Sequence, residues 1–430
     1  MLPAMWPRAT LGVLLLGALV LRLIAIGDPL SHDEGYTWLV ASAHSPAVFL
    51  DRLAAFENTP PLYYLLTSPL PDDSEAWLRI VSVLAGVGCV AAVWWVVRFT
   101  LSTYVVPNVN LAAGFAAGAL AVAPFAVSYS DYARGFVLAD AALIVALGTA
   151  LQRRWWLYSA AAAVALYTEY DSALFLMALS FVAGWRALPP LALLLPWLPE
   201  ALRHSTTKVS PIYPNPSPGS LRDTIVRLTF GEHGTAHAAS LRWLQFALVA
   251  AVCAWAFKKA PRALGIVAGG TLVLHALAHW IGPDVFAPRY LTELIPLGAI
   301  ALGCAVASLQ AQTLQVAAAA ALAALGVAVA VKRSQGNGEP DMRAITALIA
   351  PAARHRIVLT NSAAFAFYLQ PLHPHLDRPF GLGRGLEQTC AAPCRRSFLI
   401  VDDTRVANGP RPGPGAVHVF GPVYVRASRP

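Results

Sequence analysis

Long apolar runs separated by short polar turns dominate the chain. The first covers residues 11–26, is almost entirely apolar, and ends at Asp28 and Pro29. A hydrocarbon core about 30 Å thick needs roughly 20 such residues in a helix, so this run is long enough to span a membrane. We count about eleven runs of this kind. The expected spans are residues 11–27, 78–97, 111–128, 137–151, 155–168, 171–185, 187–199, 241–257, 264–281, 291–309 and 313–331.

Composition supports the same class of protein. The chain is 57% hydrophobic and only 13% charged, with a mean hydropathy of +0.56, values outside the range of soluble domains of this length. No small-x-small cleavage site follows the first run, so we expect it to stay as a span. The fold class is therefore mainly α and polytopic, in a cell membrane with lipid as its surroundings and without a nucleic-acid partner.

Basic residues indicate the orientation. A cytoplasmic N-terminus places Arg98, Lys258 and most other basic residues of short loops inside, whereas the short outer turns contain only Arg134 and Arg289. This bias follows the positive-inside rule. An odd number of spans puts the C-terminus outside, and an even number would move it to the cytoplasm.

Three outer segments are too long to be simple connections. Residues 28–76 include an acidic motif and two short runs, 36–40 and 60–66, which we expect to form helices on the membrane face. Residues 201–240 are rich in Pro, Ser and Gly and are expected to form a mobile loop. We therefore divide the chain into a transmembrane domain, 1–331, and an extracytoplasmic domain, 332–430.

The tail after residue 331 has the pattern of a small α/β unit. Residues 332–430 contain 13 basic and 6 acidic residues, most of the excess that gives the chain its charge of +8. Segments 356–360 and 397–401 are predicted as parallel strands, with a helix over 363–369. Cys390 and Cys394 could form a disulfide in an outer compartment or remain reduced, while the other three cysteines are expected in the core of the spans.

Five short motifs follow one another along the outer side. Carboxylates can deprotonate an acceptor hydroxyl, and arginine can hold phosphate oxygens with its planar fork. Their gathering on one face therefore suits a reaction at the lipid interface. The candidate residues are Asp33 and Glu34 in SHDE, Glu57, Tyr63 and Tyr64 in ENTPPLYY, Asp131 and Arg134 in YSDYAR, Glu169 in YTEY, and Arg289 and Tyr290 in PRYL.

The order of these motifs resembles the GT-C superfamily of polytopic glycosyltransferases, in the branch of the protein O-mannosyltransferases and the lipid A aminoarabinose transferase. The resemblance covers about residues 11–310. It implies transfer of a sugar from a polyprenyl-phosphate donor with inversion at the anomeric carbon. It also implies that Asp33 is the general base with Glu34 beside it. Donor phosphate and lipid would then be bound by Arg134, Arg289, Tyr290, Tyr63 and Tyr64.

Some positions depart from the family pattern. Thr59 and Glu169 stand where many relatives have histidine, and Tyr132 stands where many have glutamate. The missing histidines argue against a transition-metal site. A divalent ion held by Asp33, Glu57, Asp131 and Glu169 stays open as an alternative. His275 and His279 have a helical spacing that a metal could use, although packed core histidines explain it more simply.

Other functions remain alternatives at this point. A transporter for lipid-linked sugars would place broken helices and charges near the midplane, whereas here the charges lie in outer loops. A different enzyme that acts on lipid-linked glycans would also bind a prenyl phosphate but would not have this order of motifs. A non-catalytic membrane protein would need neither the prenyl phosphate nor the motifs. Mannose, arabinose or aminoarabinose would each fit as the sugar, and the acceptor could be a glycan, a lipid or a protein.

Overall fold

The computed structural model describes residues 6–57, 59–103, 108–199, 215–231, 238–281, 285–336 and 342–353, then 356–360, 364, 367–368, 375–380, 385–389, 395–403, 417–420 and 423–428. The chain divides into two compact units. The helical bundle comprises residues 1–26, 58–63 and 79–334, and the loop–sheet unit comprises residues 27–57, 64–78 and 335–430. The tail thus begins within three residues of the predicted boundary, but the first long loop groups with the tail.

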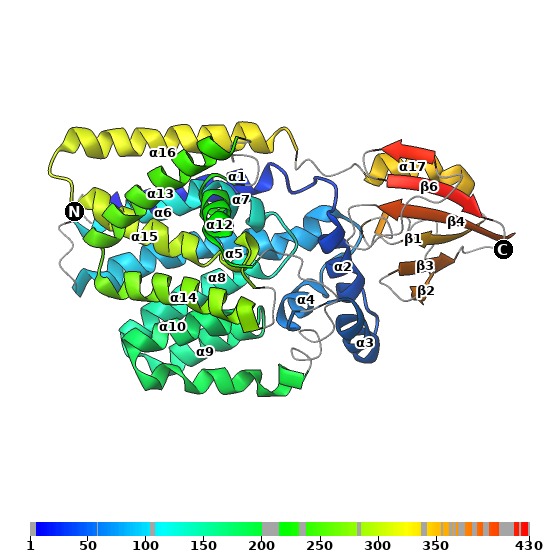
Figure 1. Ribbon diagram of the computed structural model, residues 1–430, viewed down its shortest axis with the longest axis horizontal. Coiled ribbons are helices and arrows are strands. Elements are labelled where there is room, and N and C mark those ends of the chain that lie inside the picture. The colour runs from blue at the N-terminus through cyan, green and yellow to red at the C-terminus, as the bar shows by residue number, and fades with distance from the viewer. Residues whose placement is uncertain are drawn as a thin grey trace. The chain divides into compact units, whose positions relative to one another are not determined.

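Apolar helices form the bundle (Figure 1). Two of them have local irregularities. Helix α5 continues as a π-helix, η2, and helices α6 and α7 meet at Pro124 with a bend of 62°. The helices are α1 (Trp6–Leu23), α5 (Glu75–Trp95), η2 (Val96–Thr100), η3 (Leu101–Thr103), α6 (Val109–Val122), α7 (Pro124–Ser130), α8 (Phe136–Leu151), α9 (Trp155–Leu166), α10 (Ser172–Ala183), η4 (Trp185–Ala187), η5 (Pro189–Trp197), α12 (Pro218–Phe230), α13 (Ala239–Lys259), α14 (Arg262–Ile281), η6 (Pro288–Tyr290), α15 (Leu294–Ala307) and α16 (Gln312–Arg333).

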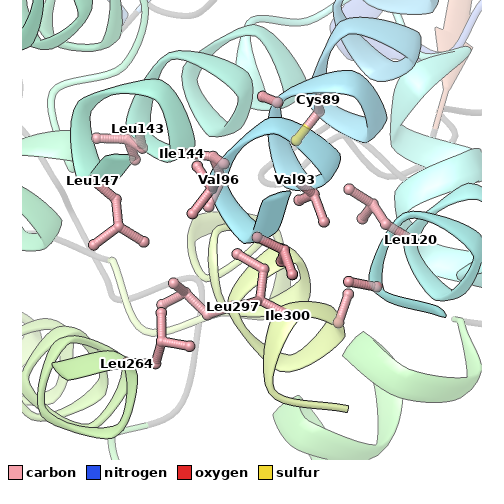
Figure 2. Close-up of a cluster of buried hydrophobic side chains, with 14 of the residues drawn as sticks. Cys89, Val93, Val96, Leu120, Leu143, Ile144, Leu147, Leu264, Leu297 and Ile300 are labelled. Atoms are coloured by element: carbon pink, nitrogen blue, oxygen red, sulfur yellow. The ribbon is translucent and has the colours of Figure 1, made fainter. Parts of the chain in front are cut away.

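One large apolar core holds the bundle together. Cys89 and Val93 of α5 lie with Leu143 of α8 and with Leu297 and Ile300 of α15 in its centre (Figure 2). Small residues allow the closest approach, between α6 and α15. A Cβ on Gly303 would lie 2.4 Å from the carbonyl oxygen of Ala112, so only glycine fits there. Close contact through small residues is typical of helix packing in membranes.

The bundle has the properties of a membrane domain, although the predicted number of spans is not confirmed. Four described helices are long and apolar enough to cross a membrane, or five if the bent pair α6–α7 is one span. Only 6% of the apolar window in α16 is buried, which indicates a lipid-facing surface. The shorter helices α8, α9, α10 and α15 coincide with four other predicted spans.

Two predictions for the bundle need correction. Residues 187–199 do not form an α-helix, because Pro189, Pro190 and Pro196 interrupt the run, and the segment is the 3₁₀-helix η5. The predicted mobile loop 201–240 contains helix α12. Ser217 accepts a hydrogen bond from Ser220 N at its start, and Leu228 packs on Phe125, so this part is ordered. Residues 200–214 lie outside the described part of the chain.

The loop–sheet unit combines short helices with a six-stranded sheet (Figure 1). Its strand order is β2-β3-β1-β4-β6-β5. The predicted parallel pair is confirmed, since β1 and β4 pair in parallel with Val358 opposite Leu399. All other neighbours pair antiparallel. The elements are α2 (His32–Ala41), α3 (Pro46–Phe56), α17 (Met342–Ala353), β1 (Arg356–Thr360), β2 (His375–Phe380), β3 (Gly385–Thr389), β4 (Arg395–Asp403), β5 (Val417–Phe420) and β6 (Val423–Ser428), while α4 (Leu62–Thr67) and α5 each cross the division between the units.

Several predictions for the tail and the cysteines fall partly outside the described residues. Most of the helix predicted over residues 363–369 lies outside the described residues, and so do both Cys390 and Cys394. Cys89 and Cys304 are buried in the core, as predicted, and Cys253 is half-buried. Strands β2, β3, β5 and β6 were not predicted, because their short, mixed sequences lack clear alternation.

Candidate functional site

Four of the five predicted motifs meet at one end of the bundle. The Leu62 amide of PPLYY donates a hydrogen bond to the Tyr167 carbonyl of YTEY at 2.9 Å. Ser82 of α5 links two other motifs, since its hydroxyl donates to the Arg134 carbonyl at 2.9 Å and lies 2.7 Å from the Tyr63 hydroxyl. With the Ser82 hydrogen used in this way, Tyr63 is the donor of the second bond.

A glycine brings YSDYAR against YTEY. A Cβ on Gly135 would lie 2.6 Å from Thr168 Cγ2 and 2.9 Å from Glu169 Oε1, so a larger residue would push the two turns apart. Gly135 directly follows Arg134 in the sequence, and Glu169 is buried beside this glycine. The predicted residues Arg134 and Glu169 are therefore neighbours, although 35 positions separate them in the chain.

Aromatic rings connect the PRYL motif to the same end. Phe136, the first residue of α8, contacts Tyr290 edge to face with ring centres 6.1 Å apart, and Tyr129 contacts Phe136 at 5.6 Å. The Arg289 guanidinium lies over the Tyr290 ring at 5.2 Å. Both Arg134 and Arg289 are half-buried, so each combines partial desolvation with some access to solvent. This arrangement can hold an anionic headgroup.

Asp131 has a partner that the sequence did not indicate. Its Oδ2 forms a short, largely buried ion pair with Arg333 at the end of α16. Nearby, a Cβ on Gly86 would lie 2.6 Å from Arg22 Nε and 2.3 Å from Ser130 Oγ, so this glycine makes room for both side chains. Because Arg333 contacts YSDYAR, the end of α16 lies at the same end of the bundle as the motifs.

A second group of ionisable residues lies inside the bundle. His275 of α14 is fully buried, and its Nδ1 lies 3.0 Å from the Thr271 carbonyl oxygen, to which it donates. Its Nε2 faces Glu293 Oε1 at 3.6 Å and Asp171 Oδ2 at 3.9 Å. A lone pair on Nε2 would repel both carboxylates, whereas a proton there would attract them. The imidazole thus links α14 to the starts of α10 and α15.

One further buried carboxylate belongs to this region. Asp140 of α8 accepts a hydrogen bond from the Thr292 hydroxyl at 3.1 Å. Asp140, Asp171 and Glu293 were not among the site residues predicted from the sequence. Asp140 stands inside an apolar run, and a charge in such a run is itself a signal of a functional or structural site.

The acidic motif SHDE lies in the loop–sheet unit and forms the start of α2. Ser31 caps this helix: its hydroxyl accepts from Glu34 N at 3.3 Å, and Glu34 Oε2 accepts from Ser31 N at 2.9 Å. Glu34 is fully buried in this reciprocal cap. Asp33 is half-buried in the first turn, where the helix dipole favours a negative charge. The two adjacent acids therefore have different environments.

The other candidates of this unit are Glu57 and Tyr64. Glu57 follows α3 as its C-cap and is buried, and Tyr64 is buried in α4. Within the described part of the chain, no group of three or more His, Cys, Asp and Glu side chains is arranged to hold a metal ion. His279 Nδ1 accepts from the Phe286 amide at 3.3 Å and does not share a site with His275 Nε2.

Comparison with known proteins gives similarity at the level of fold. No protein-family model and no curated protein match the chain. Among solved structures, ArnT from Cupriavidus metallidurans in the apo state matches with a TM-score of 0.57 and 16% identity, over 86% of this chain and 85% of that one. A structure of the same protein bound to undecaprenyl phosphate matches with a TM-score of 0.48 and 18% identity, over 81% of this chain and 65% of that one.

An archaeal oligosaccharyltransferase is also similar. AglB from Archaeoglobus fulgidus, in complex with an inhibitory peptide and a dolichol-phosphate, matches with a TM-score of 0.50 and 14% identity, over 80% of this chain and 58% of that one. This chain therefore spans less than two thirds of the length of that enzyme. At these identities the matches establish architecture. The chain therefore has the same fold as ArnT and AglB.

Proposed function

We propose that this protein is an inverting glycosyltransferase that moves a sugar from a polyprenyl-phosphate donor to an extracytoplasmic glycan, lipid or protein. One observation carries the proposal. In a GT-C fold, the motifs PPLYY, YSDYAR, YTEY and PRYL meet at one end of the bundle, in direct contact or through Ser82, Gly135 and Phe136, as a common binding region requires. The AglB structure, which shares this fold, contains a dolichol-phosphate, which supports a lipid phosphate as the donor's carrier.

The chemistry divides between two tasks. A polyprenyl phosphate is a good leaving group, so the enzyme must mainly activate the acceptor and stabilise the departing charge. Asp33 is assigned as the general base that accepts the acceptor's proton as its oxygen attacks the anomeric carbon. Arg134 and Arg289 are assigned to the phosphate, where a guanidinium can form two parallel hydrogen bonds as negative charge grows.

The geometry supports a narrower role for Glu34 than for Asp33. Glu34 is buried and its carboxylate accepts from the Ser31 amide, so it stabilises α2. Asp33 is half-buried on the same turn. Tyr63, Tyr64 and Tyr290 are assigned to the lipid side of the site, and Glu57, Asp131 and Glu169 to its support. Asp131 is engaged by Arg333, which favours a structural role for this acid.

In this proposal the protein lies in the cell membrane with about eleven spans, a number that includes the shorter apolar helices, α1 and the 3₁₀-helix η5. The motif end and the tail then face outward. An alternative is a transporter or a non-catalytic protein for lipid-linked sugars. That alternative also explains a lipid-phosphate site but needs no base at Asp33.

Mass spectrometry of lipid that co-purifies with the protein tests the donor class. We expect a polyprenyl phosphate or its sugar ester. In binding measurements, Arg134→Lys or Arg289→Lys should weaken the donor by about 1–3 kcal/mol, because lysine loses the bidentate fork. Arg98→Lys, in the π-helix η2, is the matched control. Unchanged donor affinity in both variants would mean that the phosphate is held elsewhere.

A further inference from the structure

Two adjacent residues of the C-terminal tail contact the helix that carries Asp33. The Tyr368 hydroxyl accepts a hydrogen bond from the Leu30 amide at 2.9 Å and donates one to Glu75 Oε1 at 2.9 Å. Leu30 directly precedes Ser31, the N-cap of α2. All of these residues belong to the loop–sheet unit. Tyr368 thus fixes the peptide that enters α2, three positions before Asp33.

Phe367 contacts the same helix farther along. Its ring meets Trp38 of α2 edge to face, with ring centres 5.6 Å apart and planes at 81°. Both rings are almost fully buried, with Trp38 3% and Phe367 7% exposed. Edge-to-face aromatic pairs of this kind contribute beyond their buried area. The tail therefore touches α2 both before its first turn and in its second turn.

Helix α2 needs such support. It has 10 residues, and isolated helices shorter than about 12–15 residues are marginal in water. Its other end is held by Arg52 of α3, whose Nη1 donates to the Leu39 carbonyl at 2.7 Å. The reciprocal cap of Ser31 and Glu34 closes the first turn. Tyr368 and Phe367 add support from outside the loop 27–57.

The Tyr368 hydroxyl is suited to a permanent link. Burial raises its pKa above the usual value, so it stays protonated and continues to donate to Glu75 at neutral and mildly alkaline pH. Arg343 of α17 lies 3.6 Å from the same Glu75 oxygen. The Arg343 side chain is about half exposed, so this ion pair contributes little, and the tyrosine carries the link between the tail, the start of α5 and the start of α2.

We propose that Phe367 and Tyr368 are positioning residues that hold α2, and with it the Asp33 carboxylate, in the orientation needed for transfer. The inference rests on the proposed function of Asp33 as the base. It makes the tail a part of the transfer machinery. A base displaced by about 1 Å can cost on the order of a hundredfold in rate, so a small loosening of α2 is enough to matter.

The test compares Tyr368→Phe and Phe367→Leu with the parent. Tyr158→Phe is the matched control, since Tyr158 is also buried and its hydroxyl donates to the Ala187 carbonyl at 2.6 Å, but in the helical bundle. Two quantities are measured in the full chain: hydrogen exchange of residues 28–42, and kcat and KM for sugar transfer from a polyprenyl-phosphate sugar. Tyr368→Phe should speed exchange and lower kcat about tenfold or more, with the donor KM within about twofold, because α2 loosens while donor contacts remain. Tyr158→Phe should change neither.

Each result decides the question. Unchanged exchange of residues 28–42 in Tyr368→Phe would show that the tail does not hold α2 and would overturn the proposal. Faster exchange with an unchanged kcat would overturn the positioning role. A loss of kcat of the same size in Tyr158→Phe would mark the effect as general destabilisation and also overturn it. A parent protein without transfer activity would contradict the proposed function instead, while the exchange measurement would still decide whether the tail holds α2.

Discussion

At the scale of single residues, the neighbouring acids Asp33 and Glu34 differ in role. Glu34 accepts from the Ser31 amide in the cap of α2, while Asp33 is assigned to the chemistry. Glutamine can keep the Glu34 hydrogen bond through its carbonyl oxygen, whereas alanine cannot. We expect Glu34→Ala to lower the free energy of unfolding by about 0.5–2 kcal/mol and Glu34→Gln to cost much less. Thermal unfolding in detergent checks this, and equal losses in the two variants would contradict the capping role.

The acidic motif also shows what the sequence could and could not predict. Ser31 and Glu34 have the spacing of a capping box, S-x-x-E, which is a local signal for a helix start, although the helix predicted from the sequence covered only residues 36–40. The contacts with distant segments have no such local signal. Arg333 reaches Asp131 across 202 positions, and Tyr368 reaches Leu30 across 338. No local pattern specifies such pairs, because they depend on how the whole chain packs.

At the scale of elements, buried His275 connects three helices of the bundle through Asp171 and Glu293. Removing it leaves two carboxyl groups of the interior without the polar side chain that they face, and a buried polar group that loses its partner costs about 1–3 kcal/mol. We therefore expect a clear drop in melting temperature for His275→Leu. Adding Glu293→Gln should recover part of the loss, since an amide cannot ionise in the interior. A melting temperature equal to that of the parent in His275→Leu would contradict the link.

Helix type and extent were largely predictable where apolar runs were long and uninterrupted. Helices α5, α13, α14 and α16 match predicted spans within a few residues. Prediction failed where tertiary packing outweighed composition. Helix α12 lies in a Pro-, Ser- and Gly-rich segment, but a capped start and the contact of Leu228 with Phe125 stabilise it. The opposite failure occurs at η5. Its apolar pattern predicted a membrane-spanning helix, but its prolines prevent a regular α-helix.

At the scale of the whole molecule, the contacts agree with the alternation of loops read from the basic residues. YSDYAR, YTEY, PRYL and the end of α16 were all predicted on the outer side. Asp131 of YSDYAR contacts Arg333 of α16 directly, and the next residues, Gly135 and Phe136, contact YTEY and PRYL. We expect a membrane-impermeant thiol reagent to label Ser334→Cys in intact cells. Lys259→Cys, after α13, should react only once the membrane is permeabilised. The reverse pattern would contradict the proposed orientation.

The proposed reaction is transfer of a sugar from a polyprenyl phosphate with Asp33 as the base. The most direct measurement is the rate at which purified protein consumes polyprenyl-phosphate mannose, arabinose or aminoarabinose in the presence of membrane-derived acceptors. The parent should consume at least one donor. Asp33→Asn should bind that donor normally but react about two to four orders of magnitude more slowly, because an amide cannot accept the proton. A rate for Asp33→Asn within about threefold of the parent, or no consumption of any of the three donors by the parent, would contradict the account.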